Sequence, residues 1–168
     1  DIKFPFMLHC VPVYSDYVSA KIISIDTSQA ECSTGVERVI TAKDVPGVKV
    51  FGQILKDYQI LADKQIFYNG DVVAIVVADT RDNAIQASKL IKIEAEELPP
   101  VLDSEIALED KFLVHPDFGT NIVNHHKVRR GSVEKGFEDS DLILEERFTT
   151  GFIEHSYMEP ESAICRLR

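Results

Sequence analysis

The stretch IFYNGDVVAIVVADTRDNAIQASKLIKIEAEELP, residues 66–99, carries the clearest structural signals in the chain. Asn69-Gly70 favours a tight turn, and the apolar run 72–78 after it predicts a strand that is covered on both faces. Thr80 can cap a helix, because apolar residues follow it at helical spacing. Residues 91–96 then alternate between apolar and charged side chains, which predicts a half-exposed strand. A strand, a helix and a strand in this order predict a right-handed parallel crossover.

Shorter strand patterns precede this stretch. Residues 7–13 and 19–26 are apolar and β-branched, and the polar sequence YSDY lies between them, which predicts a pair of strands joined by a turn. A turn or short helix should come next, followed by a strand over 36–41. A further short helix is expected to begin at Thr41 and to end before Pro46.

The last third of the chain has weaker patterns. Asp103 predicts the start of another short helix, because its carboxylate can accept from the free N–H groups there. Residues 113–121 contain a proline, a glycine and no periodicity, and we interpret them as a domain boundary. A helix over 132–141 and a strand over 142–150 are expected beyond it. This second region is too short for a core of its own, so it should pack on the first region or on further polypeptide.

Composition restricts the class of protein. The chain has 168 residues, 45% of them apolar and 27% charged, which is typical of a globular protein. Its formal charge of −10, from 18 basic and 28 acidic residues, argues against binding to nucleic acid. No apolar run is long enough for a membrane span, and the start lacks the layout of a signal peptide. We therefore expect a cytoplasmic protein with no membrane partner.

Sequence motifs exclude several kinds of site. Glycine-rich dinucleotide and phosphate loops are absent, as is the G-x-S-x-G elbow of hydrolases. Cys10, Cys32 and Cys165 are widely spaced, with no C-x-x-C pair, which favours reduced thiols over a metal site. His125 and His126 would point to opposite faces of a strand and could not share a metal without a bulge. Of the remaining histidines, His9 lies in an apolar strand and fits a hydrogen-bonded core histidine better than a metal ligand, and His115, before a proline, fits a loop.

The segment GFIEHSYMEPES, residues 151–162, concentrates most of the potential chemistry. Extended geometry places Ile153, His155 and Glu159 on one side and Glu154 on the other. His155 and Glu159 would lie ~13 Å apart, too far for a shared metal ion. A metal site and a catalytic pair of Glu154 and Glu159 are both weakly supported. The residues favour a structural strand that ends beside polypeptide supplied from elsewhere.

Several phrases of the sequence, in their order, resemble the molybdenum hydroxylase family, the relatives of xanthine dehydrogenase and aldehyde oxidase. They are DIKFPFMLH, SAKIISIDTS, TAKDVPGV, the stretch from YNGDVVAIVVAD to LPPVLDSEIAL, and ERFTTGFIEHSYMEPESAI. The resemblance implies an α+β fold. Residues 1–112 would form an α/β hammerhead domain with a mixed sheet and one main helix. Residues 118–168 would supply the first strands of a molybdopterin-binding domain.

The resemblance also implies a function. Such enzymes hydroxylate N-heterocycles such as purines, or aldehydes, at a molybdenum ion held by molybdopterin, and pass electrons to iron–sulfur clusters and FAD. The partners would be the remaining molybdopterin domain and the iron–sulfur and FAD domains or subunits, with a homo-oligomer left open. This chain would be an architectural part of the larger oxidoreductase, inactive and without cofactor when alone.

Residue by residue, the resemblance assigns little chemistry to this chain. Many relatives have glutamine at the position of Ile153, where its amide approaches the molybdenum ligands, and isoleucine cannot donate that hydrogen bond. Glu154, His155 and Glu159 match the family's E-H and E-P and are weak candidates near the cofactor cavity. No catalytic residue and no metal ligand is assigned. The alternatives are a non-enzymatic hammerhead module that binds a protein partner and, with less support, a carboxylate hydrolase.

Overall fold

The computed structural model describes residues 2–166, which form two units divided after His125. The first unit contains every strand of the described chain, and the second contains one short helix.

The first sheet of the first unit has three strands in the order β1-β7-β3, with both pairings antiparallel. Strand β7, Val72–Ala78, is central and has the predicted bounds, with β1, His9–Tyr14, on one side and β3, Val36–Thr41, on the other. Val76 of β7 lies opposite Val11 and Val39 in the register. The apolar run 72–78 is thus explained by a central position, where both strand edges and both faces are covered.

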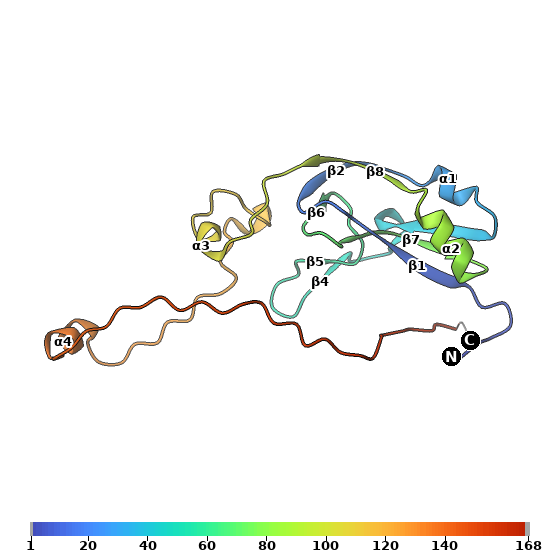
Figure 1. Ribbon diagram of the computed structural model, residues 1–168. Coiled ribbons are helices and arrows are strands. Elements are labelled where there is room, and N and C mark those ends of the chain that lie inside the picture. The colour runs from blue at the N-terminus through green and yellow to red at the C-terminus, as the bar shows by residue number, and fades with distance from the viewer. Residues whose placement is uncertain (1, 167–168) are drawn as a thin grey trace. The chain divides into compact units, whose positions relative to one another are not determined.

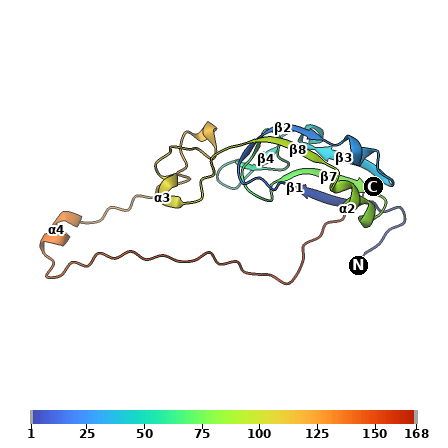
Figure 2. The ribbon, with the colours of Figure 1, turned by 45° about the horizontal axis from the view of Figure 1, so that its top comes forward.

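The second sheet has the order β6-β2-β8, again with antiparallel pairings. It joins β6, Gln65–Ile66, to β2, Ala20–Asp26, and β2 to β8, Lys92–Glu97. A two-stranded sheet is formed by β4, Val50–Phe51, and β5, Tyr58–Gln59. Figure 2 shows β2 and β8 running together in one layer, with β7 and β1 beneath them.

Two predicted pairings are wrong. β7 and β8 lie in different sheets, so helix α2 between them is not part of a parallel crossover. The strands predicted at 7–13 and 19–26 do not pair with each other either, since β1 pairs with β7 and β2 with β6 and β8. The polar turn between them is held instead by Ser15, whose N–H donates to the carbonyl of Asp71 and whose carbonyl accepts from Gly70. These bonds carry the chain out of one sheet and into the other.

Helix α2, Arg81–Ser88, begins as predicted at Thr80, whose hydroxyl accepts from the N–H of Asn83 at 3.2 Å. The helix contacts β1 and β7 (Figure 1). Its Ala84 and Ala87 are fully buried. Their small side chains allow the helix to lie close to the sheet. The hydrophobic core lies between helix and sheets and is formed by residues Ala20, Ala30, Val39, Ala62, Ile66, Val73, Ala74, Val76, Ala78, Ala84 and Ala87. Small sheets with few helices confirm the α+β class; each described pairing is antiparallel, where a mixed sheet was expected.

Three shorter helices of this unit also begin close to the predicted positions, and they are α1, Ser28–Glu31, the 3₁₀ helix η1, Ala42–Asp44, and helix α3, Ser104–Ala107. A further 3₁₀ helix, η2, Pro116–Phe118, lies in the stretch 113–121, where no helix was predicted. Thr41 and Asp44 form a reciprocal capping box, in which the Asp44 carboxylate accepts from the Thr41 N–H at 2.9 Å. The carboxylate of Asp103 caps α3 by accepting from the N–H groups of Glu105 and Ile106.

The segment 107–121, which includes the aperiodic stretch 113–121, is held in place by hydrogen bonds of the Asn121 side chain. Its amide donates to the carbonyl oxygens of Ala107 and Phe112, and its oxygen accepts from the N–H of Val114 at 2.9 Å. Asp110 accepts from the N–H of Asn121 at 2.7 Å. Side-chain hydrogen bonds thus order a stretch that has no hydrophobic periodicity.

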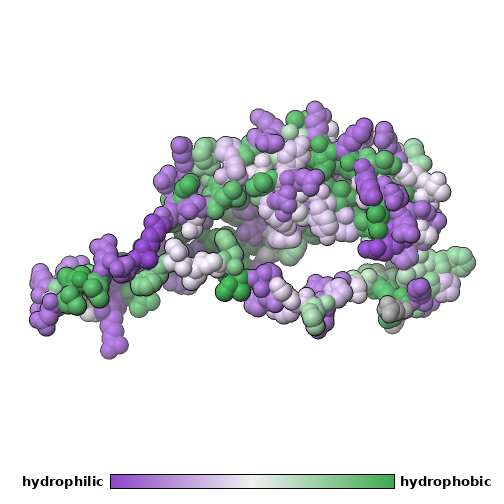
Figure 3. Space-filling view, in the orientation of Figure 1, coloured by the Kyte–Doolittle hydropathy of each residue, from purple (hydrophilic) through white to green (hydrophobic). Residues whose placement is uncertain are grey.

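The second unit contains helix α4, Val133–Glu138, within the helix predicted at 132–141, and it is capped by Ser132, whose hydroxyl accepts from the Lys135 N–H at 3.2 Å. No strand is present over residues 126–166, so the strand predicted at 142–150, and with it the first strands expected for a second domain, are not seen. A sequence that favours a strand forms one only when another backbone pairs with it. Figure 3 shows apolar side chains, in green, on the surface of the segment that carries α4.

Candidate functional site

The segment 151–162 was the main candidate from the sequence, and its side chains do not converge. Ile153 is 87% exposed, and its neighbours in the segment are exposed as well. The Glu154 carboxylate accepts from the N–H of the next residue, His155, at 3.0 Å. The rings of His155 and Tyr157 are stacked, with centroids 5.6 Å apart, on either side of Ser156, whose φ of 53° is left-handed rather than extended.

This arrangement does not fit a cofactor site by itself. A molybdenum cofactor needs donors that converge on one place. Here the Glu154 carboxylate accepts from the N–H of His155, and Glu159 lies exposed. Within residues 2–166, no three His, Cys, Asp or Glu side chains are placed to hold a metal ion. No catalytic step is therefore derived from these side chains.

The other residues noted in the sequence are dispersed. Cys10, Cys32 and Cys165 are free and exposed, and His125 and His126 are exposed in a segment without strand structure. His9 is half-buried at the start of β1. His115 packs its ring between those of Phe67, 4.2 Å away between centroids, and Phe118, 5.6 Å away. This stacking gives His115 a packing role that the sequence, which placed it in a loop, did not predict.

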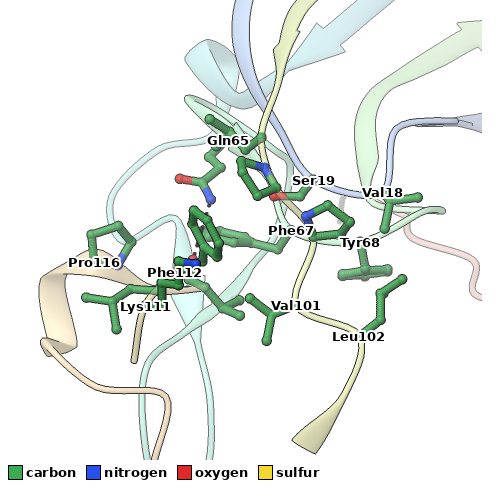
Figure 4. A pocket seen from close by; sticks show the side chains of 15 residues that line it. Val18, Ser19, Gln65, Phe67, Tyr68, Val101, Leu102, Lys111, Phe112 and Pro116 are labelled. Carbon is green, nitrogen blue, oxygen red and sulfur yellow. Dashed lines mark hydrogen bonds between the residues drawn. The ribbon is translucent and has the colours of Figure 1, made fainter. Parts of the chain in front are cut away.

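The first unit contains a cavity of about 540 Å³ at the end of the second sheet (Figure 4). Its walls come from residues 18–19, from residues 65–68, from the loop that follows β8 and from segment 107–121. The lining residues are mostly apolar, and they are Val18, Ser19, Gln65, Phe67, Tyr68, Leu98, Pro99, Pro100, Val101, Leu102, Lys111, Phe112, Leu113, Val114 and Pro116. Figure 4 shows Phe67 and Phe112 toward its middle, with Lys111 beside Phe112.

A neighbouring cavity of about 230 Å³ is lined by Tyr68 and Asp71, two side chains whose pKa values are raised. Asp71 lines it and is only 3% exposed, and burial raises the pKa of this carboxyl although the N–H of Phe67 and the side chain of Gln59 bond to it and lower the pKa. The hydroxyls of Tyr58 and Tyr68 lie 2.8 Å apart, and this hydrogen bond, with burial, raises the pKa of Tyr68. Tyr68 therefore remains neutral at ordinary pH.

Sequence reasoning did not single out Asp71, Lys111 or Asn121. Asp71 follows the predicted Asn69-Gly70 turn directly, and a polar residue between a turn and an apolar strand is a signal for a side chain that anchors the turn. Lys111 and Asn121 lie in aperiodic sequence. Their roles depend on the path of segment 107–121, which no local pattern specifies.

Two family models match the chain. The model described as "Aldehyde oxidase and xanthine dehydrogenase, a/b hammerhead domain" matches residues 1–99, and that of the "Molybdopterin cofactor-binding domain" matches residues 114–168. The quoted phrases that suggested this family fall within those matches or directly beside them.

Curated relatives match over nearly the whole chain. A probable xanthine dehydrogenase subunit of Bacillus subtilis is 37% identical over 166 residues, which are 98% of this chain and 22% of the relative. The nicotinate dehydrogenase large molybdopterin subunit of Eubacterium barkeri is 34% identical, over 98% of this chain and 38% of its own length. This chain thus spans well under half the length of either relative.

Solved structures match as well. The aldehyde oxidoreductase of Desulfovibrio desulfuricans superposes with a TM-score of 0.72 at 31% identity, over 82% of this chain and 16% of that chain. The quinoline 2-oxidoreductase of Pseudomonas putida gives a TM-score of 0.62 at 34% identity, over 70% of this chain and 16% of that chain. Fold, motifs and similarity over almost the full chain agree, and this chain belongs to the aldehyde oxidase and xanthine dehydrogenase family of molybdenum hydroxylases.

Proposed function

We propose that this chain is the N-terminal, architectural part of a molybdopterin-binding subunit of a xanthine dehydrogenase-like oxidoreductase. The observation that carries the proposal is the coverage. A relative described as a xanthine dehydrogenase subunit matches 98% of this chain, and the match takes up 22% of that relative. The complete protein would hydroxylate an N-heterocycle such as a purine, or an aldehyde, in the cytoplasm. Molybdopterin, iron–sulfur clusters and FAD would be provided by other domains or subunits.

Within that protein, we assign residues 1–112 to the α/β hammerhead domain and residues 118–168 to the start of the molybdopterin-binding domain. The two family matches, over 1–99 and 114–168, support this division. Further support comes from the second unit, where apolar side chains such as Phe148, 90% exposed, have no core to enter. Such residues need more polypeptide to cover them, which the complete protein would provide.

Ile153, Glu154, His155 and Glu159 would approach the cofactor cavity only when the rest of the domain surrounds them. Isoleucine at position 153 offers no hydrogen bond, so this wall of the cavity would contribute shape rather than an amide donor. The test is Ile153→Gln in the complete gene product. Molybdenum content should stay unchanged while kcat/KM for heterocyclic and aldehyde substrates shifts by different factors. Identical kinetics for every substrate would contradict the placement.

The proposed function is tested by producing the 168-residue chain and the complete gene product side by side in a host that makes molybdopterin. Elemental analysis should find stoichiometric molybdenum in the complete product and none in the short chain. Only the complete product should oxidise xanthine, nicotinate or an aldehyde with an artificial electron acceptor. Stoichiometric molybdenum in the short chain would overturn its architectural role, and a complete product without metal or activity would overturn the enzyme.

A non-enzymatic binding module is the second candidate, because the first unit has a hydrophobic core of its own. The coding sequence beyond Arg168 separates the two. An immediate stop codon favours the module, whereas several hundred further codons with glycine-rich loops and a late glutamate favour the enzyme.

A further inference from the structure

The cavity of about 540 Å³ in the first unit, called the Lys111 cavity below, has the size of a small-molecule site. Known ligand pockets range from about 300 to 1,000 Å³ and combine mostly apolar walls with a few polar groups that orient the ligand. Phe67 and Phe112 provide flat aromatic surfaces, and Val101 and Leu102 provide aliphatic ones (Figure 4). The neutral polar side chains of the lining are those of Ser19, Gln65 and Tyr68, and the Tyr68 hydroxyl is hydrogen-bonded to that of Tyr58.

Charge distinguishes this cavity from the rest of the molecule. The chain carries a formal charge of −10, yet Lys111 is the single charged residue among the fifteen that line the cavity. Its ammonium lies 5.6 Å from the centroid of the Phe112 ring, at the apolar wall. The ion pairs Arg38–Asp44 and Lys49–Asp63 do not involve it. A cation beside apolar walls, with no carboxylate lining the cavity, complements an anion with an apolar body.

The walls are held in place without a ligand. On one side, the N–H of Leu98 donates to the carbonyl of Ser19 at 2.9 Å and continues the pairing of β2 with β8. On the other side, the Asn121 side chain holds the backbone of Phe112 and Val114 by bonds of 2.9 Å each. Such walls lose little conformational entropy when a ligand binds.

We propose that the Lys111 cavity binds a small hydrophobic carboxylate, with its ring system or chain between Phe67 and Phe112 and its carboxylate at the Lys111 ammonium. The site consists of first-unit residues only and involves none of the residues proposed to approach the cofactor. It is therefore a second ligand site, independent of the oxidoreductase function and of its substrate.

The test uses 2-naphthoic acid and its uncharged analogue 2-naphthamide as probes, titrated calorimetrically into the 168-residue chain. Each should bind with one saturable site, and the acid should bind about fivefold more tightly, the upper range for a partly exposed ion pair. Lys111→Met should abolish the preference for the acid, and Lys111→Arg should retain it. Leu102→Asn should weaken acid and amide by the same factor. Lys89→Met, a lysine outside the cavity, is the matched control and should change neither.

The same titrations in the complete gene product decide whether the cavity is open there. Binding of the acid should again be weakened by Lys111→Met, which separates this site from any catalytic pocket that takes aromatic compounds. Loss of this dependence would mean that further polypeptide fills the cavity, and it would overturn the proposal. Non-saturable binding to the short chain, or equal affinity for acid and amide in the unsubstituted protein, would overturn it as well. Unchanged urea midpoints must first show that each variant is folded.

Discussion

Two segments that the sequence predicts to be strands have different structures in this chain. KIEAEE, residues 92–97, forms strand β8, pairs with β2 and turns Ile93 and Ala95 toward the core. LILEERFTT, residues 142–150, has no strand structure, and its apolar side chains are exposed. The positions of the apolar residues in a sequence indicate which side of a strand would be buried. Whether a strand forms depends on a second backbone to pair with and a core to cover, and only the first unit supplies both.

The largest effect should come from a charge placed in each region. Val76, fully buried in the central strand β7, has no partner for a carboxylate, so Val76→Asp should lower the unfolding free energy by about 4 kcal/mol or more. Ile143→Asp is the matched change in the second unit, where the side chain is 56% exposed, and should cost less than about 0.5 kcal/mol. Urea denaturation measures both. Similar losses would show that residues 142–150 are packed after all.

A smaller effect should follow when segment 107–121 is released from Asn121. Asn121→Ala removes two donated hydrogen bonds and one accepted bond, which together should cost about 2 kcal/mol of unfolding free energy. Gln53→Ala, at an exposed position, is the control and should leave the unfolding free energy unchanged. If Asn121→Ala changed the urea midpoint no more than the control does, the segment would belong to the linker rather than to the first unit.

The helix caps of the two units can also be compared, because Thr80 and Ser132 cap their helices by hydrogen bonds of the same length, 3.2 Å. Thr80→Ala should lower the unfolding free energy by about 1 kcal/mol, because α2 is part of the core. Ser132→Ala should leave that free energy unchanged and only speed hydrogen exchange at the amide of Lys135, which donates to the Ser132 hydroxyl at the start of α4. Equal changes in the urea midpoint would mean that α4 unfolds together with the first unit.

The smallest effect concerns pH and the buried carboxyl of the first unit. Burial raises the pKa of Asp71 in the folded protein, so the folded state holds this proton to a higher pH than the unfolded chain. The contribution of Asp71 to the unfolding free energy therefore falls as pH rises from about 4 through the raised pKa. Asp71→Asn removes this dependence. The unfolding free energy of the unsubstituted protein, minus that of the variant, should decline as the pH rises above about 4. A rising difference would reverse the sign of the pKa shift.

Local elements were predicted well because their signals are local. Thr80, Asp103 and Ser132 each cap a helix where the sequence placed a helix start, and the apolar run 72–78 is a strand with those bounds. The pairing of strands was not predicted. It depends on the Ser15–Asp71 backbone bonds, which join positions far apart in the sequence and have no composition signature.

The candidate site was predictable only as a resemblance. The sequence indicated that His155 and Glu159 were too far apart to act together, and no metal-binding cluster is present among residues 2–166. The sequence does not determine the substrate that Ile153 would face, because the side chains of this segment have no cavity around them. The Lys111 cavity was missed for a different reason, since its walls come from segments that approach each other only after folding.

The register of the first sheet has a consequence for synthesis on the ribosome. His9 pairs with Ala78, so the earliest strand cannot close its hydrogen bonds until β7 has left the exit tunnel. During that interval the nascent chain exposes an unpaired edge with valines at 11 and 13, a surface that chaperones bind and that promotes misassembly. Slow translation after β7, rather than before it, would therefore favour correct folding of this protein.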